Sequence, residues 1–150
     1  MSVASWIGDF LYHIAPQVLG VLIAGLIFQR YFVARANECA LIDYLVKGLD
    51  DLCCHAMEYW SMEVNAKNKD KARYLEARVK GSVKSLTSEL RCYSQRYAKK
   101  IDFAPLMAEV LDACTNGQFE AATRPADSAR PLTVVNSIHR VKWELMKRKL

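Results

Sequence analysis

The sequence predicts an all-α protein with one transmembrane helix near its N-terminus, which continues into a helical domain. Residues 10–28 carry no charged side chain, although 25% of the 150 residues are charged. The rest of the chain repeats apolar residues at spacings of three and four, the period of an amphipathic helix. No segment shows the alternation of apolar and polar residues that is typical of a half-buried strand.

The uncharged segment 10–28 is long enough to cross a bilayer. At about 1.5 Å per residue its 19 residues span roughly 28 Å, close to the ~30 Å hydrocarbon core. Pro16 lies early in it, where a helix tolerates proline best. His13 and Gln17 share one helical face, and we expect them to reach the headgroups; lining a polar pore in an oligomer is the alternative. The predicted division is an anchor over 1–29 and a cytoplasmic domain over 30–150.

A cleaved signal peptide is the competing interpretation, but residues 1–28 contain no Lys or Arg, so the basic n-region is missing. The charges also predict the orientation. Arg30 and Arg35 follow the segment, and Asp9 is the single charged residue before it. The positive-inside rule therefore predicts an N-terminus outside the inner membrane and a C-terminal domain in the cytoplasm. Gly20 and Ala24, four residues apart, are the candidate seam for a homo-oligomer in the membrane.

Two amphipathic helices follow. The first has its apolar seam within 31–62, at Ile42, Leu45, Leu49, Leu52, Ala56 and Tyr59. The second has Ala72, Leu75, Val79, Val83, Leu86, Leu90, Tyr93 and Tyr97 at the same spacings. The polar segment 65–70 between them predicts a turn, and a short connection between two long helices favours an antiparallel hairpin.

Two shorter helices are expected after the hairpin. The third covers 105–114, with Asp102 as its cap and Asn116-Gly117 as its stop signal. The last begins at Pro131 after a loop over 118–131. The residues expected on or near its apolar side are Leu132, Val135, Ile138, Val141 and Leu145.

Charge is unevenly distributed along the chain, whose net charge is +5. Residues 61–101 contain eleven basic and four acidic residues, and 124–150 contain seven and two. Along the second helix a basic stripe lies away from the apolar seam, at Arg73, Lys80, Lys84 and Arg91. It is a solvated face that pairs with acidic neighbours, or it attracts anionic lipid or a phosphate-bearing ligand.

No catalytic or metal-binding pattern is present in the sequence, so we expect neither an enzyme nor a cofactor. The five cysteines include no CxxC pair, and a reducing cytoplasm would keep them as thiols. Cys53, Cys54 and His55 are adjacent on a helix and point about 100° apart, which does not suit one ion. There is also no glycine-rich phosphate loop and no nucleophile elbow.

The loop 124–136 is the candidate ligand site. Arg124 and Arg130 flank a proline-containing loop that leads into a helix N-terminus, where free N–H groups and the helix dipole favour an anion. Thr133 and Asn136 could add neutral hydrogen bonds. Lys80, Lys84 and Arg91 are an alternative basic surface, and the competing interpretation of the loop is an ordinary capped turn with exposed arginines.

The chain combines one apolar span (10–28), a helical region (31–114) and an Arg-containing tail (124–148). This architecture resembles that of the compact membrane effectors of bacterial antiphage defence. Among these the chain looks most like the CRISPR-associated accessory effectors that bind cyclic oligoadenylate. The resemblance is one of architecture and carries over no binding residue. It implies a homo-oligomer that binds a nucleotide messenger and disrupts the inner membrane. The competing function is that of a single-pass adaptor or structural subunit whose hairpin docks a protein.

Overall fold

The computed structural model describes the backbone of residues 3–149 and the side chains of residues 18–149. It contains four helices: α1 (Val3–Ser61), α2 (Lys69–Tyr97), α3 (Ala104–Thr115) and α4 (Arg130–Met146). The described residues form no strand, only one isolated antiparallel bridge between Val64 and Arg124. The prediction of an all-α chain is confirmed. Residue contacts divide the chain after Cys39 into two compact units, ten residues later than the predicted boundary at 29/30.

The first unit contains the apolar part of α1. Between Val18 and Val33, eleven large apolar side chains are exposed. The exposed fraction is lowest at Ile23 (50%) and highest at Val21 (73%). By length and composition, this helix is the one described helix that could cross a membrane. The apolar segment and the amphipathic helix belong to one helix, as the missing linker predicts. The side chains of His13, Pro16 and Gln17 lie outside the described residues.

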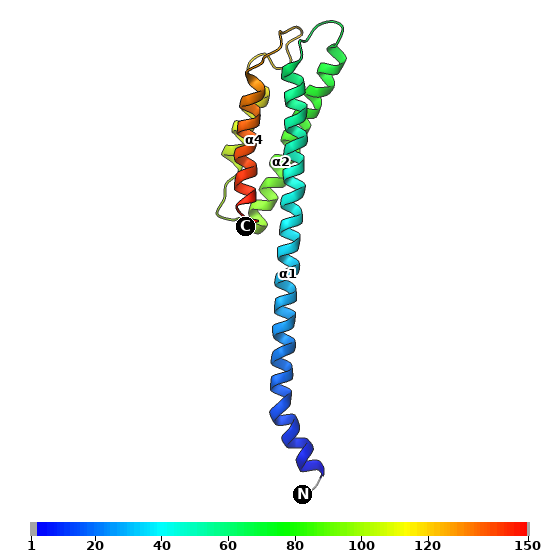
Figure 1. Ribbon diagram of the computed structural model, residues 1–150, viewed down its shortest axis with the longest axis vertical. Coiled ribbons are helices and arrows are strands. Elements are labelled where there is room, and N and C mark those ends of the chain that lie inside the picture. Colours follow the sequence, from blue (N-terminus) through cyan, green and yellow to red (C-terminus); the bar gives the residue numbers. More distant parts are fainter. Residues whose placement is uncertain (1–2, 150) are drawn as a thin grey trace. The chain divides into compact units, whose positions relative to one another are not determined.

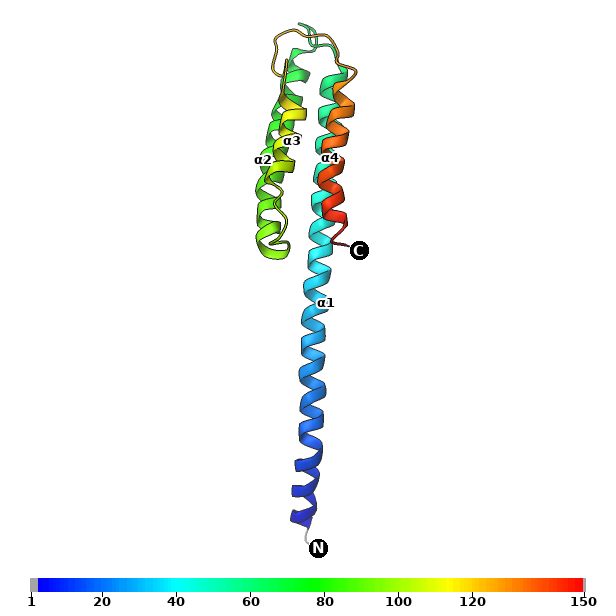
Figure 2. The ribbon, with the colours of Figure 1, turned by 90° about the vertical axis from the view of Figure 1, so that its left-hand side faces the viewer.

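The second unit is a four-helix bundle with antiparallel neighbours (Figures 1 and 2). Lys71 pairs with Glu58 at one end of α1 and α2, and the Tyr44 hydroxyl donates to Glu89 near the other end. This antiparallel register confirms the predicted hairpin. α4 also runs antiparallel to α1, because Lys142 pairs with Asp50 and Lys149 with Asp43.

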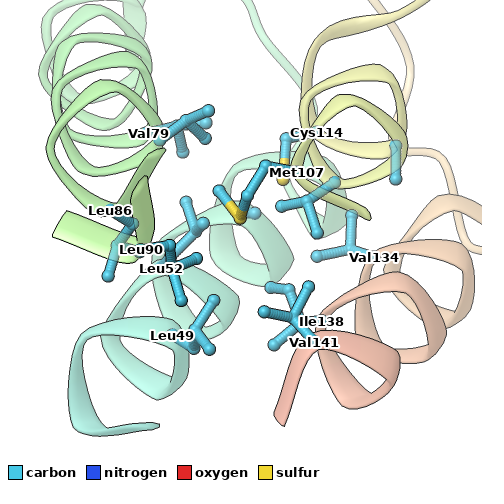
Figure 3. Close-up of a cluster of buried hydrophobic side chains, with 14 of the residues drawn as sticks. Leu49, Leu52, Val79, Leu86, Leu90, Met107, Cys114, Val134, Ile138 and Val141 are labelled. Atoms are coloured by element: carbon cyan, nitrogen blue, oxygen red, sulfur yellow. The ribbon is translucent and has the colours of Figure 1, made fainter. Parts of the chain in front are cut away.

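All four helices contribute side chains to one hydrophobic core (Figure 3). The six predicted seam residues of α1, from Ile42 to Tyr59, are fully buried, and those of α2 are buried except for the partly exposed Tyr97. Gly48 allows α1 and α2 to approach closely, because a Cβ there would lie 2.9 Å from Leu86 Cδ2. Helix periodicity therefore identified the packed faces of the hairpin correctly.

The ends of the shorter helices differ slightly from expectation. Phe103, not Asp102, is the residue at the cap position of α3, although Asp102 Oδ1 accepts a hydrogen bond from the Ala104 N–H at 2.9 Å. α3 ends as predicted, and Gly117 has φ +78°. Leu132, expected on or near the apolar side of α4, does not join the core. Leu132 is 66% exposed, and Val134 fills the first core position, one helical turn before Ile138.

Candidate functional site

Arg124 is buried at the C-terminal end of α1, where it is only 4% exposed. Its guanidinium donates to the carbonyl of Tyr59, to that of Trp60 at 3.5 Å and to that of Pro125 at 3.3 Å. The last carbonyls of a helix have no partner within the helix, so a cation with several N–H donors satisfies them well. The Arg124 guanidinium also stacks on the rings of Tyr59 and Trp60, with centroids at 4.3 and 4.5 Å.

Arg130 contacts the same aromatic group from the start of α4. Its guanidinium lies 4.9 Å from the centroid of the Trp60 ring, and Nη2 donates to the Asn116 carbonyl at 2.5 Å. Gly117 makes this position accessible, because a Cβ there would lie 2.8 Å from Arg130 Nη2. The Trp60 indole N–H donates to the Cys114 carbonyl at 2.9 Å and thereby ties α3 to the same place.

Tyr59 joins the loop over 116–129 to α2. Its hydroxyl donates to Glu76 Oε1 and accepts from the Glu120 N–H, both at 3.0 Å. Burial raises the pKa of Tyr59, so the hydroxyl remains a donor at neutral pH. These contacts form what we call the aromatic–arginine cluster, which consists of Tyr59, Trp60, Phe119, Arg124 and Arg130.

Both arginines expected to grip a phosphate have partners within the fold, Arg124 as a buried residue and Arg130 as a half-exposed one. The buried Nε atoms of Arg124 and Arg130 have no hydrogen-bond partner among the described residues, and both are shielded from solvent. Arg124 could reach a ligand only by giving up the α1 carbonyls. The structure does not show Arg124 as an exposed arginine of a capped turn, because helix carbonyls occupy its donors and aromatic rings cover its face.

Thr133 and Asn136 line a groove of about 540 Å³ between α3 and α4, and neither Arg124 nor Arg130 lines it. The groove is also lined by Glu109, Asp112 and Arg140, and Arg140 is paired with Glu109. Two carboxylates and one neutralised guanidinium do not favour an anion. This groove therefore does not join Thr133 and Asn136 to the two arginines.

The alternative basic surface is present on α2. Arg73, Lys80, Lys84 and Arg91 are all exposed, as predicted. Lys80 pairs with Glu120 at 2.5 Å, while Lys84 and Arg91 form no ion pair with any described residue. α2 has eight basic and three acidic side chains, so its excess equals the net charge of +5 of the whole chain.

The expected membrane seam is open in the single chain. A Cβ at Gly20 or at Gly25 would meet no atom within 4 Å, and Ala24 is exposed. A second helix could therefore approach this stretch closely, as small-xxx-small spacing allows.

The cysteines are free thiols, and the described residues contain no group of three or more His, Cys, Asp or Glu side chains placed to hold a metal. Cys114 is buried in the core, and this burial raises its pKa to about 12. Cys54 and Cys92 are exposed. The Cys53 thiol donates to the Met57 sulfur, 3.7 Å away, along α1.

No protein-family model, curated protein or solved structure matches this chain. Sequence patterns alone missed Trp60, which adjoins the last seam residue and organises the aromatic–arginine cluster. A tryptophan directly after a helical seam, followed later by two arginines in a proline-containing loop, was the available signal.

Proposed function

We propose that this protein is a non-enzymatic, single-pass adaptor of the inner membrane whose cytoplasmic bundle docks an acidic partner protein through α2. The observation that supports the anchor is the exposure of its eleven large apolar side chains over Val18–Val33. Each such side chain gains about 1.5–3 kcal/mol on leaving water, so lipid is a better environment for this segment. Arg30 and Arg35, which follow the uncharged segment 10–28, favour a cytoplasmic bundle.

The exposed basic side of α2 supports the choice of partner. Arg73, Lys84 and Arg91 lie along this helix without an ion pair to a described residue. The row does not line one shared cavity: Arg91 lines a hollow of about 290 Å³ together with Asp102, and Arg73 lines another of about 140 Å³ together with Glu76 and Glu120. A small-molecule site would instead enclose most of its ligand in one concave pocket. A complementary acidic protein surface fits an extended row of charges better, and such rows chiefly accelerate and orient association.

Site-specific photo-cross-linking of the full-length protein in cells tests this function. A cross-linking residue at Lys84 should give one discrete protein adduct, and the same residue at exposed Asn136 on α4 should give none. Replacing Arg73 and Arg91 by Glu should lower the Lys84 adduct at least about tenfold, because like charges would then face the acidic partner. Equal adducts at both positions, or a yield unaffected by the charge reversal, would reject the adaptor.

The second candidate is an effector that binds a cyclic oligonucleotide messenger and disrupts the inner membrane as a homo-oligomer. The observation that favours it is the concentration of the whole net charge on α2, which attracts phosphates as well as carboxylates. In an oligomer, α2 helices from several copies could together enclose a ligand that one copy leaves exposed.

Native mass spectrometry of the detergent-solubilised protein, alone and with cyclic tetra-adenylate, separates the two candidates. The effector requires an oligomer with bound nucleotide, and the adaptor requires neither. If the nucleotide binds, Lys84→Ala or Arg91→Ala should weaken it by about ten- to a hundredfold, the value of a charge-assisted contact.

A further inference from the structure

Three segments that are distant in sequence meet at one end of the bundle. Lys149 Nζ lies 2.5 Å from Asp43 Oδ1, which brings the residues after α4 beside the start of the bundle part of α1. Arg148 Nη2 donates to the Tyr97 carbonyl at 3.1 Å, which adds the end of α2. Figure 1 shows the C-terminus and the α2–α3 connection at this same end, which we call the base of the bundle.

The base is basic. Its positive side chains are Arg96, Lys99, Lys100, Lys147, Arg148 and Lys149. Its acidic side chains are Asp43, Asp102 and Glu144, of which Asp43 and Glu144 pair with Lys149 and Lys147. Lys99 and Lys100 are exposed and form no ion pair with a described residue. Six basic and three acidic groups leave an excess of three positive charges on a small surface.

Exposed apolar groups adjoin these charges. Trp143 is 55% exposed, and the Lys147 ammonium lies 5.5 Å from the centroid of its ring. Met146 is also exposed. Tryptophan next to lysine is the combination enriched where proteins meet the headgroup region of a bilayer, because the ring prefers the interface and the cation prefers anionic lipid.

Connectivity limits how far the base can lie from a membrane that holds the apolar segment. The large apolar side chains end at Val33, and the bundle begins at Ala40. Even a fully extended chain of seven residues reaches only about 25 Å. Lys84, in contrast, lies 12 residues before Arg96 on α2, or roughly 18 Å along the helix, which is more than twice the Debye length of ~8 Å.

We infer that the base of the bundle docks on anionic phospholipid headgroups of the same membrane that holds the apolar part of α1. This inference rests on the membrane anchor in the proposed function. It assigns to Arg96, Lys99, Lys100 and Lys147 a role different from that of the α2 side chains. Docking on lipid would hold the bundle against the membrane and leave α2 residues farther from the base available to a partner.

Hydrogen exchange of the full-length protein in nanodiscs tests the docking. Nanodiscs of phosphatidylcholine alone are compared with nanodiscs that contain about 30% phosphatidylglycerol, since the anionic lipid is the proposed ligand. Each Lys or Arg at an anionic surface favours contact by about fivefold. Amides of 96–101 and 143–149 should therefore exchange at least about tenfold more slowly with the anionic lipid, and high salt should remove the difference.

The variant pair Lys99→Glu with Lys100→Glu should abolish the lipid-dependent protection. The matched control, Arg73→Glu with Lys84→Glu, changes the net charge equally and should retain it. Equal exchange in both lipids would overturn the docking even though the protein stays in the nanodisc. If the amides of the base were protected in native membranes but not in anionic nanodiscs, the base would bind a membrane protein, and the proposed docking on lipid would also be overturned. Failure to remain in any nanodisc would instead refute the anchor.

Discussion

Replacing Arg124 tests whether this residue stabilises the fold or binds a ligand. In Arg124→Ala the Tyr59 carbonyl loses a charged donor, and a buried group left without a partner costs about 1–3 kcal/mol. Two ring contacts, at 4.3 and 4.5 Å, contribute about 0.5–2 kcal/mol together. The Trp60 carbonyl still accepts from the Asp127 N–H at 2.9 Å, so it adds little. We expect a loss of roughly 2–4 kcal/mol in the free energy of unfolding.

The assay is urea unfolding of the full-length protein in mild detergent, followed by near-ultraviolet circular dichroism of the aromatic–arginine cluster. Arg124→Lys keeps the charge but not the planar fork, so it should lose about half as much. Arg73→Ala, at an exposed residue of α2, is the control and should change stability by less than about 0.5 kcal/mol. An Arg124→Ala protein as stable as the wild type would refute the structural role of this arginine.

Three further changes test other parts of the molecule. Gly48→Leu should destabilise the bundle by about 1–3 kcal/mol, because even a Cβ at this position would crowd Leu86. Adding Leu86→Ala to this variant should recover part of the loss in the same unfolding assay. Additive losses of the two substitutions would exclude the close approach of α1 and α2. Gly20→Leu should lower cross-linking between copies in the membrane if the small-residue seam is used, whereas unchanged cross-linking would remove the seam. Cys114 should resist alkylation at pH 8 while Cys54 and Cys92 react, because burial raises the pKa of Cys114 from 9.0 to about 12. Between pH 9 and about 12 the Cys114 thiol keeps its proton in the folded protein and loses it in the unfolded chain, so the free energy of unfolding should fall as pH rises through this range. Labelling of Cys114 as fast as that of Cys54 would contradict its burial.

Local periodicity predicted most of the fold. The α1 and α2 seams are defined by apolar residues three and four apart, and their burial follows from helix geometry alone. The turn between these helices and the stop at Gly117 also depend on neighbouring residues only. The start of α4 was harder, since Leu132 and Val134 are both apolar and only the packing against the other helices decides which one is buried.

The candidate site could not be predicted in the same way, because it depends on contacts between distant residues. Arg124 finds its partners at Tyr59 and Trp60, 65 and 64 residues away, and no local pattern distinguishes such an arginine from an exposed one. Thr133 and Asn136 were grouped with the arginines by sequence proximity, but they line a groove with acidic residues of α3, whereas Arg124 bonds to the end of α1. The base of the bundle likewise becomes a single surface only when Tyr97 and Arg148 are brought together.

The proposed anchor requires that the uncharged segment 10–28 crosses a membrane and leaves the bundle in the cytoplasm. The most direct measurement is alkaline carbonate extraction of membranes from cells that express the full chain with a fluorescent protein after Leu150. The expected result is a fluorescent fusion that stays in the membrane pellet. Leu19→Arg with Leu22→Arg should release it, because each arginine costs about 2.5–3.5 kcal/mol near the centre of a span. A wild-type fusion that carbonate releases would contradict the anchor, and a non-fluorescent, membrane-bound fusion would contradict the orientation.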